Sequence, residues 1–329
     1  MNSPQPPELH LSILDTVPIV EGSTAREALA NTADLARQAD LLGFRRYWVP
    51  EHHGMPGVAG AATSVIIEHL ASATERIRVG SGGVLLPNHS PLVLAEQFGT
   101  LEAFHPGRID LGIGRALGGR KPVVESVRPE TLRTARTYEE QLAELISHFS
   151  PGAAPILAVP ASGNEPQLWL LGSSDFSARL ASKLGLPYAF AGHLNPSGIG
   201  SVLAEYRPTP LGQAEQGRTI LTVPVIAADT DEQADWLAGS IKLRLLRRSR
   251  KIRGLLPTAE EAAKYRFGPE EERAVEDAMR GYIIGSGDTA RAALCSLSAA
   301  TGCAELMVTT PIHDHRARCR SYELLVSSG

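Results

Sequence analysis

Apolar and polar residues alternate along the chain in one repeating order, a short apolar segment followed by a longer amphipathic one. The first apolar segment, 9–14, precedes a helical pattern that Ser23 or Thr24 can cap and that Gly43 ends. The order recurs, so we expect strands at 9–14, 46–51, 77–86, 108–113, 168–171, 188–191, 219–227 and 305–310. Helices are expected at 25–42, 61–73, 91–104, 131–149, 174–184, 199–206, 289–300 and 314–326.

Eight strands, each followed by a helix, are typical of a closed parallel barrel, the (β/α)8 or TIM barrel. A doubly wound open sheet is the second choice, because such sheets usually have fewer strands. No change in composition divides the chain, so we expect one barrel domain over 9–329 after a disordered tail at 1–8. The connection after the seventh strand, 230–288, is unusually long and is expected to be an insertion.

The composition is that of an ordinary globular enzyme, with 43% hydrophobic and 21% charged residues. A net charge of −4 does not favour nucleic acid or a membrane surface as a partner. The basic run at 242–253 lacks interleaved aromatic residues, so a solvated helix face or a lid explains it better than nucleic-acid binding. No apolar run reaches the roughly 18–20 residues that span a bilayer, and the proline-rich tail lacks the features of a signal peptide. Cys295, Cys303 and Cys319 have no metal-like spacing and are expected to be free thiols in a reducing cytoplasm.

The ends of the predicted strands carry the residues best suited to chemistry, and in a parallel barrel these ends share one face. The second strand ends in Glu51-His52-His53. A carboxylate and two imidazoles pack poorly but can transfer protons near neutral pH, which favours a catalytic site over a polar strand end that only contacts water. The other strand ends with small or polar residues are Asp15, Gly82-Gly83, Gly114-Arg115, Gly172-Ser173-Ser174, Gly192-His193 and His313.

Two of these ends contain paired glycines or an arginine beside glycines. Gly82-Gly83 interrupts a strand that resumes at once, which indicates either a bulge or backbone clearance for a flat ligand, and we favour the ligand. The glycines before Arg115 resemble a dinucleotide fingerprint only superficially, because Gly118 comes one position too late. A fixed cation for an anionic group is the preferred interpretation of Arg115, with a solvated surface arginine as the alternative.

The fifth strand leads into a helix through Gly172-Ser173-Ser174, and Ser177 follows one turn later. Small hydroxylated residues at a helix start leave amide groups free for an anion, so this segment favours phosphate binding over plain capping. Near the last helix, Asp314 is interpreted as a simple N-cap. A metal site that joins His313 or His315 to the histidines of the second strand has no supporting ligand spacing.

Taken together, several segments resemble the bacterial luciferase-like flavin monooxygenases. They are 42–53, 77–87, 89–91, 95–96, 106–115, 171–174 and 305–310. The resemblance implies a (β/α)8 barrel that binds FMN, usually as reduced FMN (FMNH2) supplied by a separate flavin reductase. It also implies a homodimer packed through early barrel helices.

The resemblance also implies roles for individual residues. His52 matches the catalytic histidine of the family, with Glu51 and His53 beside it. Gly82 and Gly83 match the position of a non-proline cis peptide beneath the flavin ring. The flavin phosphate would be held by Arg115 together with Gly172, Ser173, Ser174 and Ser177. Two departures exclude light emission as an implication: Gly114 and Ser173 stand where the luciferase has a cysteine and an acidic residue.

The resulting hypothesis is an FMN-dependent monooxygenase that uses reduced flavin and O2 on a small, apolar organic substrate in the cytoplasm. His52 would exchange protons during the reaction, and Glu51 or a backbone carbonyl would set its tautomer. The alternatives are a deazaflavin-dependent oxidoreductase that transfers hydride, and a flavin-binding relative without catalysis. Within the insertion, Lys251–Phe267 is predicted to be a lid that is mobile without ligand and ordered when reduced flavin binds.

Overall fold

The computed structural model describes residues 9–207, 219–252 and 254–326, and the expected tail at 1–8 lies outside them. Eight parallel strands form a ring in which each pairs with the next along the chain, and the last pairs with the first and with the seventh. They are β1 (His10–Leu14), β2 (Arg46–Val49), β3 (Arg78–Ser81), β5 (Ile109–Gly114), β6 (Gln167–Gly172), β7 (Tyr188–Phe190), β8 (Thr219–Ala228) and β10 (Glu305–Thr309). This closure confirms the predicted barrel and contradicts the open doubly wound sheet.

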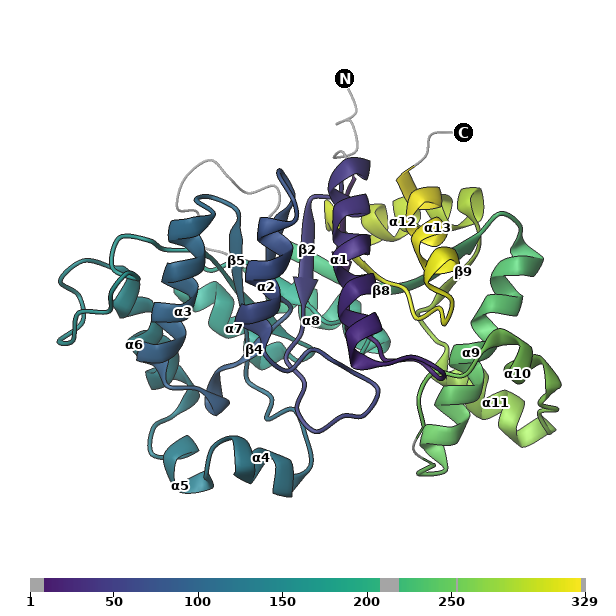
Figure 1. The fold of residues 1–329 in the computed structure, drawn as a ribbon, viewed down its shortest axis with the longest axis horizontal. Coiled ribbons are helices and arrows are strands. Elements are labelled where there is room, and N and C mark those ends of the chain that lie inside the picture. The colour runs from purple at the N-terminus through teal and green to yellow at the C-terminus, as the bar shows by residue number, and fades with distance from the viewer. Residues whose placement is uncertain (1–8, 208–218, 253, 327–329) are drawn as a thin grey trace.

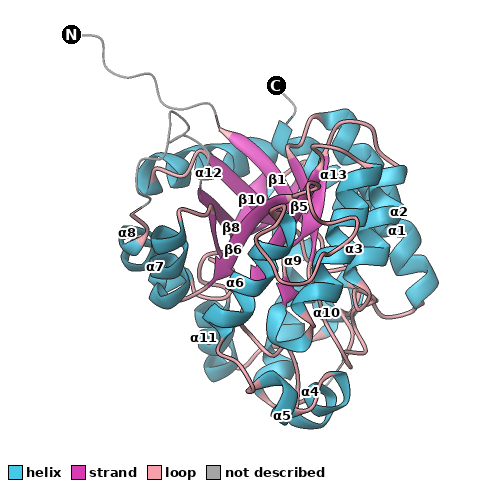
Figure 2. Cartoon of the chain, turned by 90° about the vertical axis from the view of Figure 1, so that its left-hand side faces the viewer, coloured by secondary structure: helices cyan, strands magenta, loops and turns pink. Residues whose placement is uncertain are grey.

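One main helix follows each strand of the ring and packs on its outside (Figure 2). The helices are α1 (Ala25–Leu42), α2 (Thr63–Ser72), α3 (Pro91–Phe104), α6 (Tyr138–Phe149), α7 (Asp175–Leu184), α8 (Ile199–Glu205), α12 (Gly287–Thr301) and α13 (His315–Val326). Helix α1 illustrates the local rules. Thr24 and Glu27 form a capping box, and Gly43 ends the helix in a left-handed conformation. Predicted and observed helices agree within a few residues, except before α6.

The predicted helix at 131–149 begins later than expected. Two short helices, α4 (Lys121–Val127) and α5 (Glu130–Arg133), come first, and α6 starts only after Thr137. Thr137 and Glu140 form a second capping box there, which fixes the start of α6. The connection after β5 therefore contains two short helices at the C-terminal end of the barrel strands. Figure 1 shows it at the lower left.

The predicted strand at 77–86 is in fact two strands. A cis peptide bond joins Gly82 and Gly83 between β3 and β4 (Val84–Leu85), and β4 resumes the pairing with β5. A Cβ on Gly82 would lie 2.6 Å from the Leu14 side chain, and one on Gly83 would lie 2.7 Å from a backbone oxygen of β5. Both glycines are therefore required by close packing within the barrel itself.

The barrel interior is layered. Near the start of the strands, the buried Arg46 guanidinium pairs with Asp110 at 2.9 Å and with Glu305 at 2.8 Å. Each charge therefore has a partner, which a buried ion requires. The next layer is apolar, and the rings of Trp48 and Trp169 meet edge to face with centroids 5.6 Å apart. Because side chains fill the interior, a binding site has to lie at the strand ends.

The long connection after β8 is regular structure. It contains α9 (Asp231–Ser249), α10 (Ala259–Lys264) and α11 (Pro269–Ala278), and it returns through β9 (Ile283–Ser286), which pairs in parallel with the end of β8. Two short 3-10 helices, at Leu86–Asn88 and Pro196–Gly198, complete the elements. In Figure 1, α9, α10 and α11 lie together at the lower right. Among the described residues, no helix is long and apolar enough to cross a membrane.

Candidate active site at the strand ends

Glu51 is the hub of the loop that follows β2. Its buried carboxylate accepts hydrogen bonds from the Leu85 amide at 3.0 Å, and it contacts Nε2 of His89 at 2.7 Å and Nε2 of His53 at 2.9 Å. Burial alone would raise the pKa of Glu51, but the contacts with His89, Leu85 and His53 outweigh it and lower the pKa. Glu51 therefore carries its charge at neutral pH and fastens the β2 loop to the segment after β4.

His52, the predicted catalytic histidine, is half-buried next to Glu51 but is not bonded to its carboxylate. The hydrogen bonds of the Glu51 carboxylate go to other groups, and the buried Nδ1 of His52 has no partner within the described part of the chain. The expectation that Glu51 or a backbone carbonyl sets its tautomer is therefore wrong for this conformation. Burial lowers the pKa of His52, with Glu51 opposing and His53 reinforcing the change. The imidazole is neutral at pH 7 and free to exchange a proton.

A second half-buried imidazole lies close to His52. His193 follows β7, and its Nδ1 is likewise buried without a partner among the described residues. Burial and the nearby charge of His52 lower the pKa of His193 to about 4. The sequence places His193 at a strand end but gives it no role. Only the closed ring brings the ends of β2 and β7 near each other, which the spacing of the two residues in the chain does not reveal.

The residues predicted to bind phosphate lie at and beside the start of α7. The Arg115 guanidinium lies over the Phe176 ring, 4.0 Å from its centroid, in the first turn of that helix. A Cβ on Gly172 would lie 2.3 Å from Oγ of Ser177, so this glycine leaves room for the serine hydroxyl. The structure thus brings Arg115 to the segment that contains Gly172 and Ser177, which lies far from it in sequence.

The first turn of α7 keeps polar groups available. Ser174 is the N-cap residue, yet its side chain makes no capping hydrogen bond. The Ser173 carbonyl is held by the Asn195 amide at 2.8 Å, which fixes the loop. Asp175 pairs with Arg179 and accepts the Phe176 amide at 3.0 Å, so one helix amide is already used. The remaining groups, with a cation beside them, have the chemistry that a phosphate requires.

A cavity of about 720 Å³ lies at the same end of the barrel. Its walls come from three connections, namely the loop after β2, the residues that precede α4, and the end of α9 with the segment that follows it (Figure 1). His53 lines this cavity, whereas the residues predicted to bind phosphate do not. The cavity therefore reaches the loop that carries the histidines while staying separate from the start of α7.

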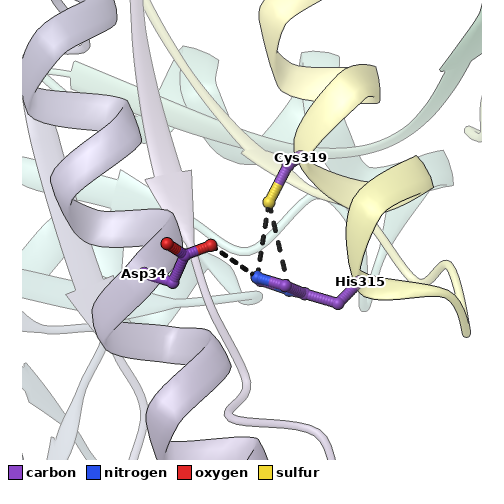
Figure 3. A group of neighbouring side chains, drawn as sticks. All are labelled: Asp34, His315 and Cys319. Atoms are coloured by element: carbon purple, nitrogen blue, oxygen red, sulfur yellow. Dashed lines mark hydrogen bonds and ion pairs between the residues drawn. The ribbon is translucent and has the colours of Figure 1, made fainter.

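The histidines near the last helix lie elsewhere. Nε2 of His313 contacts the Glu21 carbonyl at 2.9 Å, and Nε2 of His315 contacts Asp34 at 2.8 Å and Sγ of Cys319 at 3.5 Å (Figure 3). Burial raises the pKa of the Cys319 thiol to about 11, so it stays protonated near neutral pH. Neither histidine joins the β2 histidines.

Two other expectations about this region are resolved. Asp314 accepts the Ala317 amide at 2.8 Å and caps α13, as predicted. Asp15, at the end of β1, is a structural residue. Its buried carboxylate bonds to the side chains of Thr32, Tyr47 and Arg318. Asp15 therefore fastens α1 and α13 to the barrel and does not face the site.

Comparison with known proteins agrees with this geometry. Residues 9–304 match the family described as luciferase-like monooxygenase. A protein of Escherichia coli (strain K12) named "Luciferase-like monooxygenase" is 41% identical over 320 residues, 95% of each chain. The "N-acetyl-S-alkylcysteine monooxygenase" of Bacillus subtilis (strain 168) is 34% identical, covering 96% of this chain and 97% of its own. The crystal structure of apo-MsnO8 superposes with a TM-score of 0.88 at 38% identity, covering 97% and 98% of the two chains. The chain therefore belongs to the luciferase-like monooxygenase family and is a flavin-dependent monooxygenase.

Proposed function

We propose that this enzyme uses reduced FMN and O2 to transfer one oxygen atom to a small organic molecule with an apolar portion. The observation that carries the proposal is the arrangement at the strand ends. His52, whose buried Nδ1 has no partner among the described residues, and the Gly82-Gly83 segment lie at the same end of the barrel as Arg115 and the start of α7. A proton-transferring group, a site for a flat ring and a site for a phosphate are the three features that an FMN enzyme needs.

The residues of the site fit FMN. Arg115, Ser173, Ser174 and Ser177, with the amides after Gly172, would hold the phosphate, and the Gly82-Gly83 segment would support the ring. When bound in reduced form, FMN supplies the reaction with O2, and the protein contributes position, exclusion of water and proton transfer. Nδ1 of His52 would accept or release the proton, because this nitrogen is buried without a partner among the described residues and the imidazole is neutral.

Glu51 and His53 would act through position. The charged Glu51 carboxylate holds His53 and His89, so the loop that carries His52 cannot shift without breaking buried hydrogen bonds. A separate reductase would deliver the reduced FMN, and the chain would work as a homodimer in the cytoplasm. The name of the Bacillus subtilis relative suggests thioethers as the first substrates to test, followed by aldehydes, ketones and aromatic polyketides.

Oxygen transfer under single-turnover conditions tests the proposal. Chemically reduced FMN, ¹⁸O2 and N-acetyl-S-methylcysteine are mixed with the wild-type protein, and mass spectrometry follows ¹⁸O in the product. The His52→Ala variant should transfer oxygen roughly 10²–10⁴-fold more slowly, the usual loss when a general acid or base is removed. His69→Ala, which removes an exposed imidazole on α2, is the matched control and should keep the wild-type rate.

Two results would contradict the proposal. Equal rates for wild-type protein and His52→Ala would contradict proton transfer by His52. The absence of ¹⁸O from the product across the whole substrate series would contradict monooxygenase activity. Substrate-dependent reduction of a deazaflavin without O2 would instead favour the hydride-transferring alternative, and tight FMN binding without any turnover would favour the non-catalytic one.

A further inference from the structure

The cavity beside His53 is lined by an unusual set of charges. Five of its lining residues are basic, namely Arg120, Arg244, Arg247, Arg248 and Lys251. None of its described lining residues is an aspartate or a glutamate. In a protein with a net charge of −4, such a concentration of one sign is not explained by composition.

Among the residues that the structure describes, carboxylates neutralise one of these basic side chains. Arg247 forms ion pairs with Glu21 and Glu261. The other four basic side chains that line the cavity have no carboxylate partner among the residues that the structure describes. Burial and the neighbouring charge of Arg248 lower the pKa of Arg244. Two adjacent guanidinium groups without a counter-charge repel each other, and an anion between them would relieve the repulsion.

Apart from His53, the rest of the cavity wall is apolar. Met55, Pro56, Ile252 and Leu255 line it together with four glycines. Met55 and Ile252 are 42% and 53% exposed, although large apolar side chains usually avoid water. A molecule that fills this space would cover them. The combined surface therefore suits an organic anion, with an apolar body and one negatively charged group.

The position of the cavity connects it to the reaction. His53 forms part of its wall and is bonded to Glu51, one residue from His52. Arg115 and the first turn of α7, which form the phosphate site, contribute nothing to its lining. The cations of the cavity are therefore available to a second molecule while the phosphate of FMN occupies its own site.

We propose that this cavity binds the organic substrate, and that Arg244 and Arg248 hold an anionic group of the substrate, a carboxylate or a sulfonate. The apolar body of that substrate packs against Met55 and Leu255. The assignment of the bound molecule as the substrate rests on the proposed function. The binding of an organic anion rests only on the charges and walls of the cavity.

A pair of fluorescent probes tests the proposal without turnover. The sulfonate 8-anilinonaphthalene-1-sulfonate and its uncharged counterpart N-phenyl-1-naphthylamine have nearly the same apolar body. In the Arg244→Gln/Arg248→Gln protein the sulfonate should bind about tenfold more weakly, since each charge-assisted contact contributes strongly, while the neutral probe binds as before. The matched control is Arg250→Gln on the same stretch of chain. Arg250 is paired with Glu271 and does not line the cavity, so its loss should leave both probes unaffected.

FMN binding separates this proposal from the proposed function. The Arg115→Gln variant should bind FMN more weakly and the sulfonate normally. The Arg244→Gln/Arg248→Gln variant should bind FMN normally and the sulfonate more weakly. Loss of FMN affinity in the double variant would assign these cations to the cofactor and overturn the proposal. Failure of every variant and of the wild-type protein to bind FMN, with the probe pattern intact, would contradict the proposed function alone.

The wild-type protein provides an independent measurement in case the double variant does not fold. Sulfonate binding should weaken as the ionic strength rises from low to physiological, because salt screens the cations, and binding of the neutral probe should not. Equal salt dependence of the two probes, or equal sulfonate affinity in Arg250→Gln and the double variant, would overturn the proposal.

Discussion

The imidazoles of His52 and His193 lie near each other, and the buried Nδ1 of each has no hydrogen-bond partner within the described chain. The folded protein therefore resists protonating them, and the pKa of His193 falls to about 4. In the unfolded chain the same imidazole has a pKa of about 6.5. Between these two values only the unfolded state binds the proton, so the free energy of unfolding must decrease as the pH falls from about 6.5 towards about 4.

Replacement of His193 by glutamine should remove part of this acid sensitivity. One proton bound only by the unfolded state contributes a slope of about 1.4 kcal/mol per pH unit, and His193→Gln should reduce the slope by up to that amount. Urea unfolding followed by circular dichroism at several pH values between 4 and 7 measures this slope of the unfolding free energy. His69→Gln is the control variant. An identical slope in wild-type protein and His193→Gln would show that His193 is protonated in the folded state.

Individual side chains differ in how much the sequence reveals about them. Glu51-His52-His53 is visible as a cluster because its members are consecutive, and Arg115 is visible because glycines precede it. The bond between Glu51 and His89 joins residues 38 positions apart. This bond depends on where the chain turns after β4, and no local sequence pattern predicts that turn. Contacts of this kind require the fold before they can be predicted.

Among the elements, the insertion after β8 is the one that sequence analysis described least well. Its charged residues indicate a solvated stretch, yet α9 buries Ala234, Leu237, Ala238 and Ile241 along one face. The spacing of these residues is that of an amphipathic helix and was visible in the sequence. Helix α10 is anchored too, because Ala259 and Ala262 are buried and Leu256 pairs with Val20. Any lid must therefore move around these anchors.

The lid hypothesis leads to a prediction about which bonds trypsin cuts first, because the anchored segments should be protected. Trypsin should cut first between Arg248 and Lys251, at the end of α9, because the side chains there are exposed, and only later at Lys264 in the anchored α10. Reduced FMN should slow the first cut if the segment orders over the flavin. Gel electrophoresis and mass spectrometry of the fragments follow the reaction, with casein as the control for trypsin itself. Equal cleavage with and without reduced FMN would leave a static insertion as the better description.

At the scale of the whole molecule, each of the first three helices exposes a large apolar side chain. Leu41 on α1, Val65 on α2 and Phe104 on α3 are 79%, 68% and 69% exposed, and these helices lie side by side in Figure 1. A second copy of the chain would cover them. We therefore expect a dimer through α1–α3, in keeping with the homodimer that the family resemblance implies.

A charge placed on this surface should dissociate the dimer. Val65→Glu and Phe104→Glu should shift the mass measured by light scattering after gel filtration from that of a dimer towards that of a monomer, because a carboxylate buried at the interface would have no partner. Trp236→Glu is the control, since Trp236 is also 44% exposed but lies on α9, away from these helices. A wild-type protein with the mass of a monomer would contradict the prediction.

The barrel as a whole was predictable because its signal is repeated. Eight apolar segments, each followed by an amphipathic one, outweigh errors of a few residues at any boundary. The interruption of the third strand at Gly82-Gly83 and the late start of α6 depend on close contacts between strands and on capping, which act after the fold has formed. Length and periodicity therefore determine the architecture, while the exact ends of the elements are decided by packing.

The bond between Asp15 and Arg318 has a consequence for the protein during its synthesis. Asp15 lies on the first strand and Arg318 on the last helix, and β1 also needs β10 as a neighbour. A ribosome adds Arg318 only 303 residues after Asp15. Until then Asp15 has no counter-charge, and β1 lacks one of its two neighbours. The nascent chain cannot complete its barrel until its last helix emerges. Chaperones that bind exposed strands should therefore contact it throughout elongation.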